Sequence, residues 1–114
     1  MSTIDLKPEH MKLVRDILAR HLPGHDVRVF GSRAIGTSKP HSDLDLVIMG
    51  DAPLPVTTMR LLRDAFDDSD LPFQVDLVEW AGTSEEFRKI IEVTAILLEK
   101  DHSKMLDRRM HGTG

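Results

Sequence analysis

Apolar side chains recur at every third or fourth position near the start of the chain, which is the spacing of one face of an α-helix. The members of this stripe are Met11, Val14, Ile17, Leu18 and Leu22. Pro8 suits the first turn, where the backbone N–H groups have no helical partner in any case. Pro23 and Gly24 interrupt the pattern. The sequence therefore predicts a helix over about residues 7–22.

Three shorter apolar runs fit β-strands, because each is rich in Val, Ile, Leu or Phe and is bounded by turn-forming residues. We expect these strands at about residues 27–30, 44–49 and 73–79. Between the second and the third run, Met59, Leu62 and Phe66 stand at helical spacing. This spacing predicts a helix at about residues 57–66.

A last helix is predicted from Thr83 onward. Thr83 and Glu86 have the spacing of a capping box, in which the two side chains bond to backbone N–H groups at the start of a helix. An apolar face then continues through Phe87, Ile90, Ile91, Ala95 and Leu98. The chain after Lys100 is polar and mixed in charge, which favours a frayed end. We therefore expect one domain over residues 1–100 and a flexible polar tail over residues 101–114.

A pair of aspartates at the start of the second predicted strand gives the chain its candidate chemistry. Gly31 and Ser32 follow the first strand, ten residues intervene, and then come Asp43 and Asp45. Residues two apart in a strand point to the same face, so both carboxylates should project together while Leu44 faces away. Paired carboxylates suit Mg²⁺, which prefers oxygen ligands. An isolated Asp-x-Asp is weak evidence, because aspartate is common at turns.

Asp76 interrupts the apolar run of the third predicted strand. If that strand is mostly buried, the carboxylate needs a partner, because burying an unpaired charge is costly. We expect Asp76 to converge with Asp43 and Asp45, where it could bind a cation and act as a general base. Three converging carboxylates repel one another, which raises the pKa of at least one of them until a cation binds. Metal binding and activity should therefore weaken in acid.

The connections between these strands predict the topology of the sheet. For one pocket to include both the Gly31 turn and the aspartate pair, the first two strands must run antiparallel. The second and third strands are joined through a helix, which suits a parallel pair. The sequence therefore predicts a small mixed β-sheet packed with helices, an α/β (α+β) fold.

The turn after the first strand is a candidate phosphate site. Gly31 leaves room for a close approach of the backbone, and Ser32 offers a hydroxyl beside the backbone amides of the turn. Arg33 could add a positive charge toward phosphate or could be a solvated turn residue. Lys39 and His41 lie in the following loop, where ordinary loop charge is the favoured interpretation.

Composition narrows the class of function. The chain has 114 residues and 40% hydrophobic content, enough for one modest core. Its formal net charge of −4 disfavours direct binding to nucleic acid. The absence of cysteine excludes disulfides and thiolate metal sites. No apolar run has the length of a signal core or a membrane span, so we expect a cytoplasmic protein without a membrane anchor.

The motifs described above resemble the minimal nucleotidyltransferase (MNT) proteins of the DNA polymerase beta superfamily, and the resemblance covers nearly the whole chain. It implies a nucleotidyltransferase (polymerase beta-like) fold and ATP as substrate. Carried over to this sequence, Gly31 and Ser32 match the phosphate turn, Asp43 and Asp45 the catalytic metal pair, and Asp76 the third catalytic and metal-binding carboxylate. Two Mg²⁺ ions are then expected, one beside the attacking hydroxyl and one on the triphosphate.

The resemblance also implies a second protein, because the chain is too short to include an acceptor domain. In this family the partner is a helical HEPN protein, and such pairs often act as toxin and antitoxin. The implied function is Mg²⁺-dependent transfer of AMP from ATP to a hydroxyl of the HEPN partner. Two alternatives stay open: a non-catalytic nucleotide-binding antitoxin that acts by contact, and nucleotidyl transfer to a small molecule with a partner subunit. One departure is Ile35, where relatives often have arginine.

Overall fold

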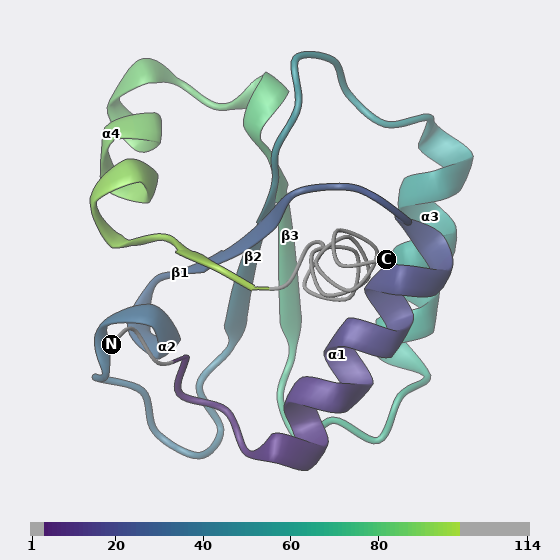
Figure 1. Cartoon of the computed structure of the whole chain (residues 1–114), viewed down its shortest axis with the longest axis vertical. Helices are drawn as coiled ribbons and strands as arrows, with labels where there is room; N and C mark the ends of the chain where they lie inside the picture. The colour runs from purple at the N-terminus through teal and green to yellow at the C-terminus, as the bar shows by residue number, and fades with distance from the viewer. Residues whose placement is uncertain (1–3, 99–114) are drawn as a thin grey trace, which may run out of the picture.

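The computed structural model describes residues 4–98 of the chain (Figure 1). In chain order the elements are α1 (Pro8–His21), β1 (Val27–Phe30), α2 (Ser32–Ile35), β2 (Leu44–Ile48), α3 (Val56–Asp67), β3 (Val75–Glu79), the 3₁₀ turn η1 (Trp80–Gly82), α4 (Glu85–Thr94) and β4 (Ile96–Leu97). The predicted tail at residues 101–114 lies outside the described residues. No helix within residues 4–98 is both long and apolar enough to cross a membrane.

The strands form one mixed sheet in the order β3-β2-β1-β4. β1 runs antiparallel to β2 and to β4, whereas β2 and β3 are parallel and are joined through α3. The predicted mixed sheet and α+β class are therefore confirmed. In the register of this sheet, Asp45 of β2 lies opposite Phe30 of β1 on one side and opposite Asp76 of β3 on the other.

Helices α1 and α3 lie together on one side of the sheet, and α4 lies on the other (Figure 1). The larger core lies under α1 and α3 and is formed by Val14, Leu18, Leu22, Val27, Val29, Leu44, Leu46, Ile48, Met59, Leu62, Phe66 and Leu98. The smaller core, on the α4 side, contains Phe30, Val47 and Ile91. Burial of these apolar side chains is the main force that holds the layers together.

The end of the described chain departs from the predicted helix. Ser84, not Thr83, caps α4, because its Oγ accepts a hydrogen bond of 3.2 Å from the Phe87 N–H. Ala95 has extended dihedral angles, and the next two residues pair with β1 as β4. The apolar positions through Leu98 suggested one continuous helix. Instead, Ile96 and Leu97 pair with β1, which gives hydrogen-bond partners to backbone groups at the otherwise free edge of β1, and Leu98 is buried.

Candidate functional site

The turn that follows β1 brings the first motif against the second. Gly31 has a φ of +79°, a conformation that side-chain-bearing residues rarely adopt. A β-carbon at this position would overlap Oδ2 of Asp45 and lie 3.3 Å from its Cγ. Glycine is therefore required twice, once for the backbone angle and once because the carboxylate of Asp45 occupies the space of a side chain. Two residues separated by fourteen positions in the chain meet directly.

Two of the candidate carboxylates are neighbours across the parallel strands. Asp45 and Asp76 are register partners, so their side chains leave the same face of the sheet. Leu44 and Leu46, on either side of Asp45, are fully buried on the opposite face, as the alternation in the sequence predicts. Asp43 is exposed and directly precedes β2. The carboxylates thus belong to one end of the sheet, near the Gly31 turn.

The predicted burial of Asp76 is wrong. Its side chain is exposed, because β3 is an edge strand of the sheet and α4 does not cover this end of it. The apolar run around Asp76 indicated a central strand buried on both faces, but only one face of β3 packs on the core under α1 and α3 at this point. Asp76 therefore reaches the position beside Asp45 without the cost of full burial.

Burial and neighbouring charges both affect the carboxyl group of Asp45. Partial burial raises the pKa of the Asp45 carboxyl, and the negative charges of Asp76 and Asp43 raise that pKa further. Both effects disfavour the ionised form, since burial removes hydration and like charges repel. The carboxylate whose pKa is raised is thus the one in contact with Gly31.

The carboxylate oxygens of Asp43, Asp45 and Asp76 can be compared with the ligands that a divalent cation prefers. Within residues 4–98 no three His, Cys, Asp or Glu side chains are gathered tightly enough to form a ready-made metal site. The three aspartates nevertheless offer only hard oxygen donors, and they lie close enough for Asp43 and Asp76 to act on the pKa of Asp45. Mg²⁺ commonly uses one or two protein carboxylates and takes its other ligands from phosphate and water. The chemistry of the group fits such an ion.

Arg33 is neither a solvated turn residue nor free to donate toward phosphate, the two interpretations that the sequence left open. Its side chain is only 5% exposed, and its guanidinium donates hydrogen bonds to the backbone carbonyls of Asp5, Lys39, Pro40 and Ser42 at 2.8–3.3 Å. The same group lies over the ring of Phe73, 4.3 Å from its centroid. The predicted phosphate contact does not fit this arrangement, because the N–H donors of Arg33 already point at protein carbonyls.

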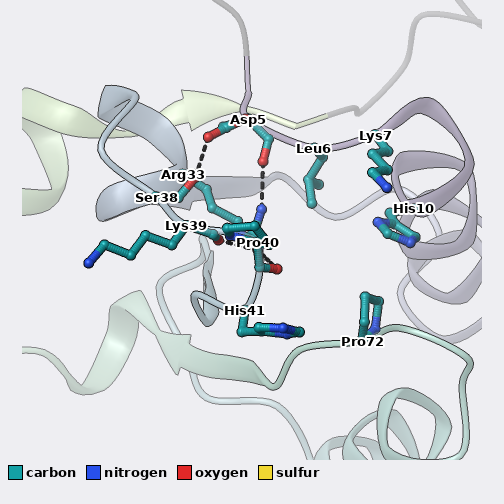
Figure 2. Close-up of a pocket in the computed structure, with 10 residues that line it drawn as sticks. All are labelled: Asp5, Leu6, Lys7, His10, Arg33, Ser38, Lys39, Pro40, His41 and Pro72. Carbon is teal, nitrogen blue, oxygen red and sulfur yellow. Dashed lines mark hydrogen bonds between the residues drawn. The ribbon is translucent and has the colours of Figure 1, made fainter.

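A short N-terminal segment that we did not link to the site is tied to α2. The N–H of Asp5 donates to the carbonyl of Arg33 at 2.8 Å, and Nη1 of Arg33 donates back to the carbonyl of Asp5 at 2.8 Å. The hydroxyl of Ser38 also donates to the Asp5 carboxylate (Figure 2). No hydrophobic periodicity marks this segment, so the sequence pattern carried no signal for these contacts.

A pocket of about 470 Å³ lies beside this segment (Figure 2). It is lined by Asp5, Leu6, Lys7, His10, Arg33, Ser38, Lys39, Pro40, His41 and Pro72. Its lining includes neither the Gly31 turn nor the three aspartates. Lys39 and His41 are exposed and belong to this pocket. Ile35, which ends α2, is 55% exposed.

Comparison with known proteins assigns the class. The family described as "Nucleotidyltransferase domain" matches residues 11–103, and the chain belongs to this family. A Haemophilus influenzae protein named "Probable protein adenylyltransferase MntA" is 44% identical over 99 residues, which cover 86% of this chain and 87% of that protein. The family predicted from the Gly31 and aspartate motifs is therefore confirmed.

Solved structures give the same fold. A protein solved as a candidate minimal nucleotidyltransferase is 31% identical, with a TM-score of 0.60 over 77% of this chain and 88% of that chain. A chain of a toxin–antitoxin structure with AMP-PNP is 20% identical, with a TM-score of 0.65 over 89% and 87%. A chain from the complex of tri-AMPylated Shewanella oneidensis HEPN toxin with MNT antitoxin is 16% identical, with a TM-score of 0.62 over 93% and 88%.

Proposed function

We propose that this protein transfers AMP from ATP to a hydroxyl of a helical HEPN partner protein, in a reaction that depends on Mg²⁺. The observation that carries the proposal is the contact of Asp45 with Gly31, beside Asp76, because it joins the candidate phosphate turn and the carboxylates in one place. The 44% identity to a protein named as a protein adenylyltransferase supports the choice of AMP and of a protein acceptor.

Each residue has a separate role in this proposal. Gly31 and Ser32 receive the β- and γ-phosphates, through the backbone amides of the turn and the Ser32 hydroxyl. Asp43, Asp45 and Asp76 hold Mg²⁺, which when bound supplies positive charge to the triphosphate and the departing pyrophosphate. Arg33 is left out of this set, because its donors point at backbone carbonyls.

Asp76 is the proposed general base. The carboxylate accepts the proton of the acceptor hydroxyl while the oxygen of that hydroxyl bonds to the α-phosphorus. The bond from the α-phosphorus to the oxygen bridging the α- and β-phosphates breaks, and pyrophosphate leaves with that oxygen. The exposure of Asp76 on an edge strand supports an acceptor that comes from a second molecule.

The partner is proposed from chemistry and from relatives together. The exposed position of Asp76 on an edge strand leaves the proposed general base open to a hydroxyl of a second protein. A structural neighbour comes from a complex of an MNT antitoxin with an AMPylated HEPN toxin, which supports a HEPN protein as acceptor. The most direct test mixes the protein with a HEPN protein as candidate partner, ATP and Mg²⁺, and measures the intact mass of that partner. We expect a gain of one or more AMP groups.

The matched variants are Asp43→Asn and Asp45→Asn, which keep the shape of the side chain and remove its charge. Both should form the complex but leave the mass of the partner unchanged. A wild-type complex that forms normally and gains no AMP would contradict the proposal. If the asparagine variants still neutralise the partner, inhibition by contact is the function and catalysis is not.

A further inference from the structure

Arg33 is a buried cation whose partners are backbone carbonyls. It is 5% exposed, and within the described residues it takes part in no ion pair, in contrast to Arg28, which pairs with Asp26. Burial of a charge is tolerated only when hydrogen bonds replace water. Nε and Nη2 both donate to the carbonyl of Ser42, at 3.0 and 2.8 Å, and Nη2 also lies 3.1 Å from that of Pro40 and 3.3 Å from that of Lys39.

These contacts converge on the loop that leads into β2. The carbonyls of Lys39, Pro40 and Ser42 all turn toward one guanidinium, and Ser42 directly precedes Asp43. The loop is closed further by two bonds between Lys39 and Ser42, from the Ser42 N–H to the Lys39 carbonyl and from the Lys39 N–H to the Ser42 Oγ. The position of Asp43 is therefore set from one side by Arg33.

Arg33 also reaches the other two parts of the candidate site. It belongs to α2 and directly follows Ser32 in the chain. Its guanidinium covers the ring of Phe73, three residues before Asp76. Next to Phe73, the carbonyl of Gln74 accepts the N–H of Leu44, which joins the starts of β2 and β3. One side chain thus contacts or adjoins the segments that carry the phosphate turn and the carboxylates.

We propose that Arg33 is a positioning residue for nucleotidyl transfer, which holds Asp43 in place relative to Ser32 and Asp76 and does not touch the nucleotide. This inference rests on the proposed function. It depends on the shape of the guanidinium as well as its charge, because a planar fork of N–H donors can serve several carbonyls at once. A lysine ammonium at position 33 keeps the charge but not the fork.

The variant Arg33→Lys therefore separates positioning from phosphate binding. If Arg33 positions Asp43, kcat for AMP transfer to the HEPN partner should fall roughly 10- to 100-fold, as expected for a displaced reacting group. The affinity for AMP-PNP should stay close to the wild-type value, and the Mg²⁺ concentration for half-maximal activity should rise. Hydrogen exchange of backbone amides should speed up within residues 39–46 and stay unchanged in α1 and α3.

Arg88→Lys is the matched control. Arg88 also donates to a backbone carbonyl, that of Trp80, and lies over the Trp80 ring at 4.7 Å, but its hydrogen bonds go to Trp80 and Thr83 and none goes to the loop that leads to Asp43. The Arg88→Lys variant should have a lower melting temperature than the wild type and an unchanged kcat. Phe73→Leu provides a second variant if Arg33→Lys does not fold, since it removes the ring under the guanidinium and keeps the arginine. The Phe73→Leu variant should lower kcat and speed up amide exchange in residues 39–46, as Arg33→Lys does, but by smaller factors.

Two results would overturn this proposal. A loss of AMP-PNP affinity in Arg33→Lys with unchanged exchange in residues 39–46 would make Arg33 a phosphate ligand. An equal loss of kcat in Arg33→Lys and Arg88→Lys, at matched loss of melting temperature, would reduce its role to general stability. If the wild-type protein transfers no AMP, the proposed function fails, while amide exchange and AMP-PNP binding still decide whether Arg33 holds the Asp43 segment.

Discussion

The two faces of the sheet use neighbouring residues of the same strand for different purposes. On the side of α1 and α3, β2 presents Leu44, Leu46 and Ile48, which are almost completely removed from water. On the side of α4 it presents Asp45 and Val47, of which only Val47 is covered by apolar side chains. The comparison teaches that one face of β2 is entirely core, whereas the other face is divided between the smaller core at Val47 and the candidate site at Asp45.

The largest expected effect on the fold comes from the covered face. Leu46→Ala should lower the free energy of unfolding by about 2–5 kcal/mol, because it leaves a cavity in a close-packed core. Chemical denaturation followed by circular dichroism measures this loss. AMP transfer at a temperature where the variant is still folded should be nearly normal. A loss below about 1 kcal/mol would contradict the assignment of this face as the main core.

The adjacent residue should show the opposite behaviour. Asp45→Asn should abolish AMP transfer and, near neutral pH, should raise the free energy of unfolding. The reason is that burial and the charges of Asp76 and Asp43 disfavour the ionised Asp45 carboxylate, and asparagine carries no charge. Thermal melting and the intact mass of the partner are measured on the same sample. A destabilised Asp45→Asn variant would show that the carboxylate supports the fold, contrary to the comparison of the two faces.

Substitution of Gly31 tests whether its close contact with Asp45 matters for stability and for AMP transfer. Gly31→Ala should reduce AMP transfer and destabilise the protein by about 1–3 kcal/mol, because the new methyl group meets Asp45 at a strained backbone angle. Gly36→Ala is a partial control, since Gly36 also has a positive φ, +82°, but no atom lies near the added methyl group. Its ψ of 17° is in the left-handed region that alanine can adopt at a modest cost, whereas the ψ of −155° at Gly31 is essentially restricted to glycine. Gly36→Ala should therefore lose less stability than Gly31→Ala and keep its activity. An equal loss of activity in Gly31→Ala and Gly36→Ala would show that the Gly31–Asp45 contact has no specific role in AMP transfer.

The smallest effect is a dependence on pH. A carboxyl whose pKa is raised in the folded state holds its proton more tightly there than in the unfolded chain. The contribution of Asp45 to stability is then full below the usual aspartate pKa of about 3.9 and is lost as pH rises through the raised folded value. The melting temperature of Asp45→Asn minus that of the wild type should therefore grow from acid toward neutral pH. A difference that shrinks over this range would contradict the sign of the shift.

Much of this architecture follows from local sequence patterns. The spacing of Val14, Leu18 and Leu22 fixed the helix α1, and alternation around Asp45 fixed which side chains of β2 are buried. The strand directions followed from the lengths and types of the connections. These features depend on residues close in the chain, where hydrophobic periodicity carries most of the information.

The features that the sequence did not predict depend on contacts between distant residues. The run after α4 has helical periodicity, and only the free edge of β1 explains why Ile96 and Leu97 form a strand. The exposure of Asp76 depends on the place of β3 at the edge of the sheet. The carbonyl partners of Arg33 come from the backbone, so the side-chain pattern does not reveal them.

The reciprocal bonds between Asp5 and Arg33 have a practical consequence for handling the protein. Through these bonds, the first residues of the described chain help to hold Arg33, which in turn holds the loop that leads to Asp43. An affinity tag fused directly ahead of this segment, or a start site moved beyond residue 6, would disturb that support and lower activity without unfolding the domain.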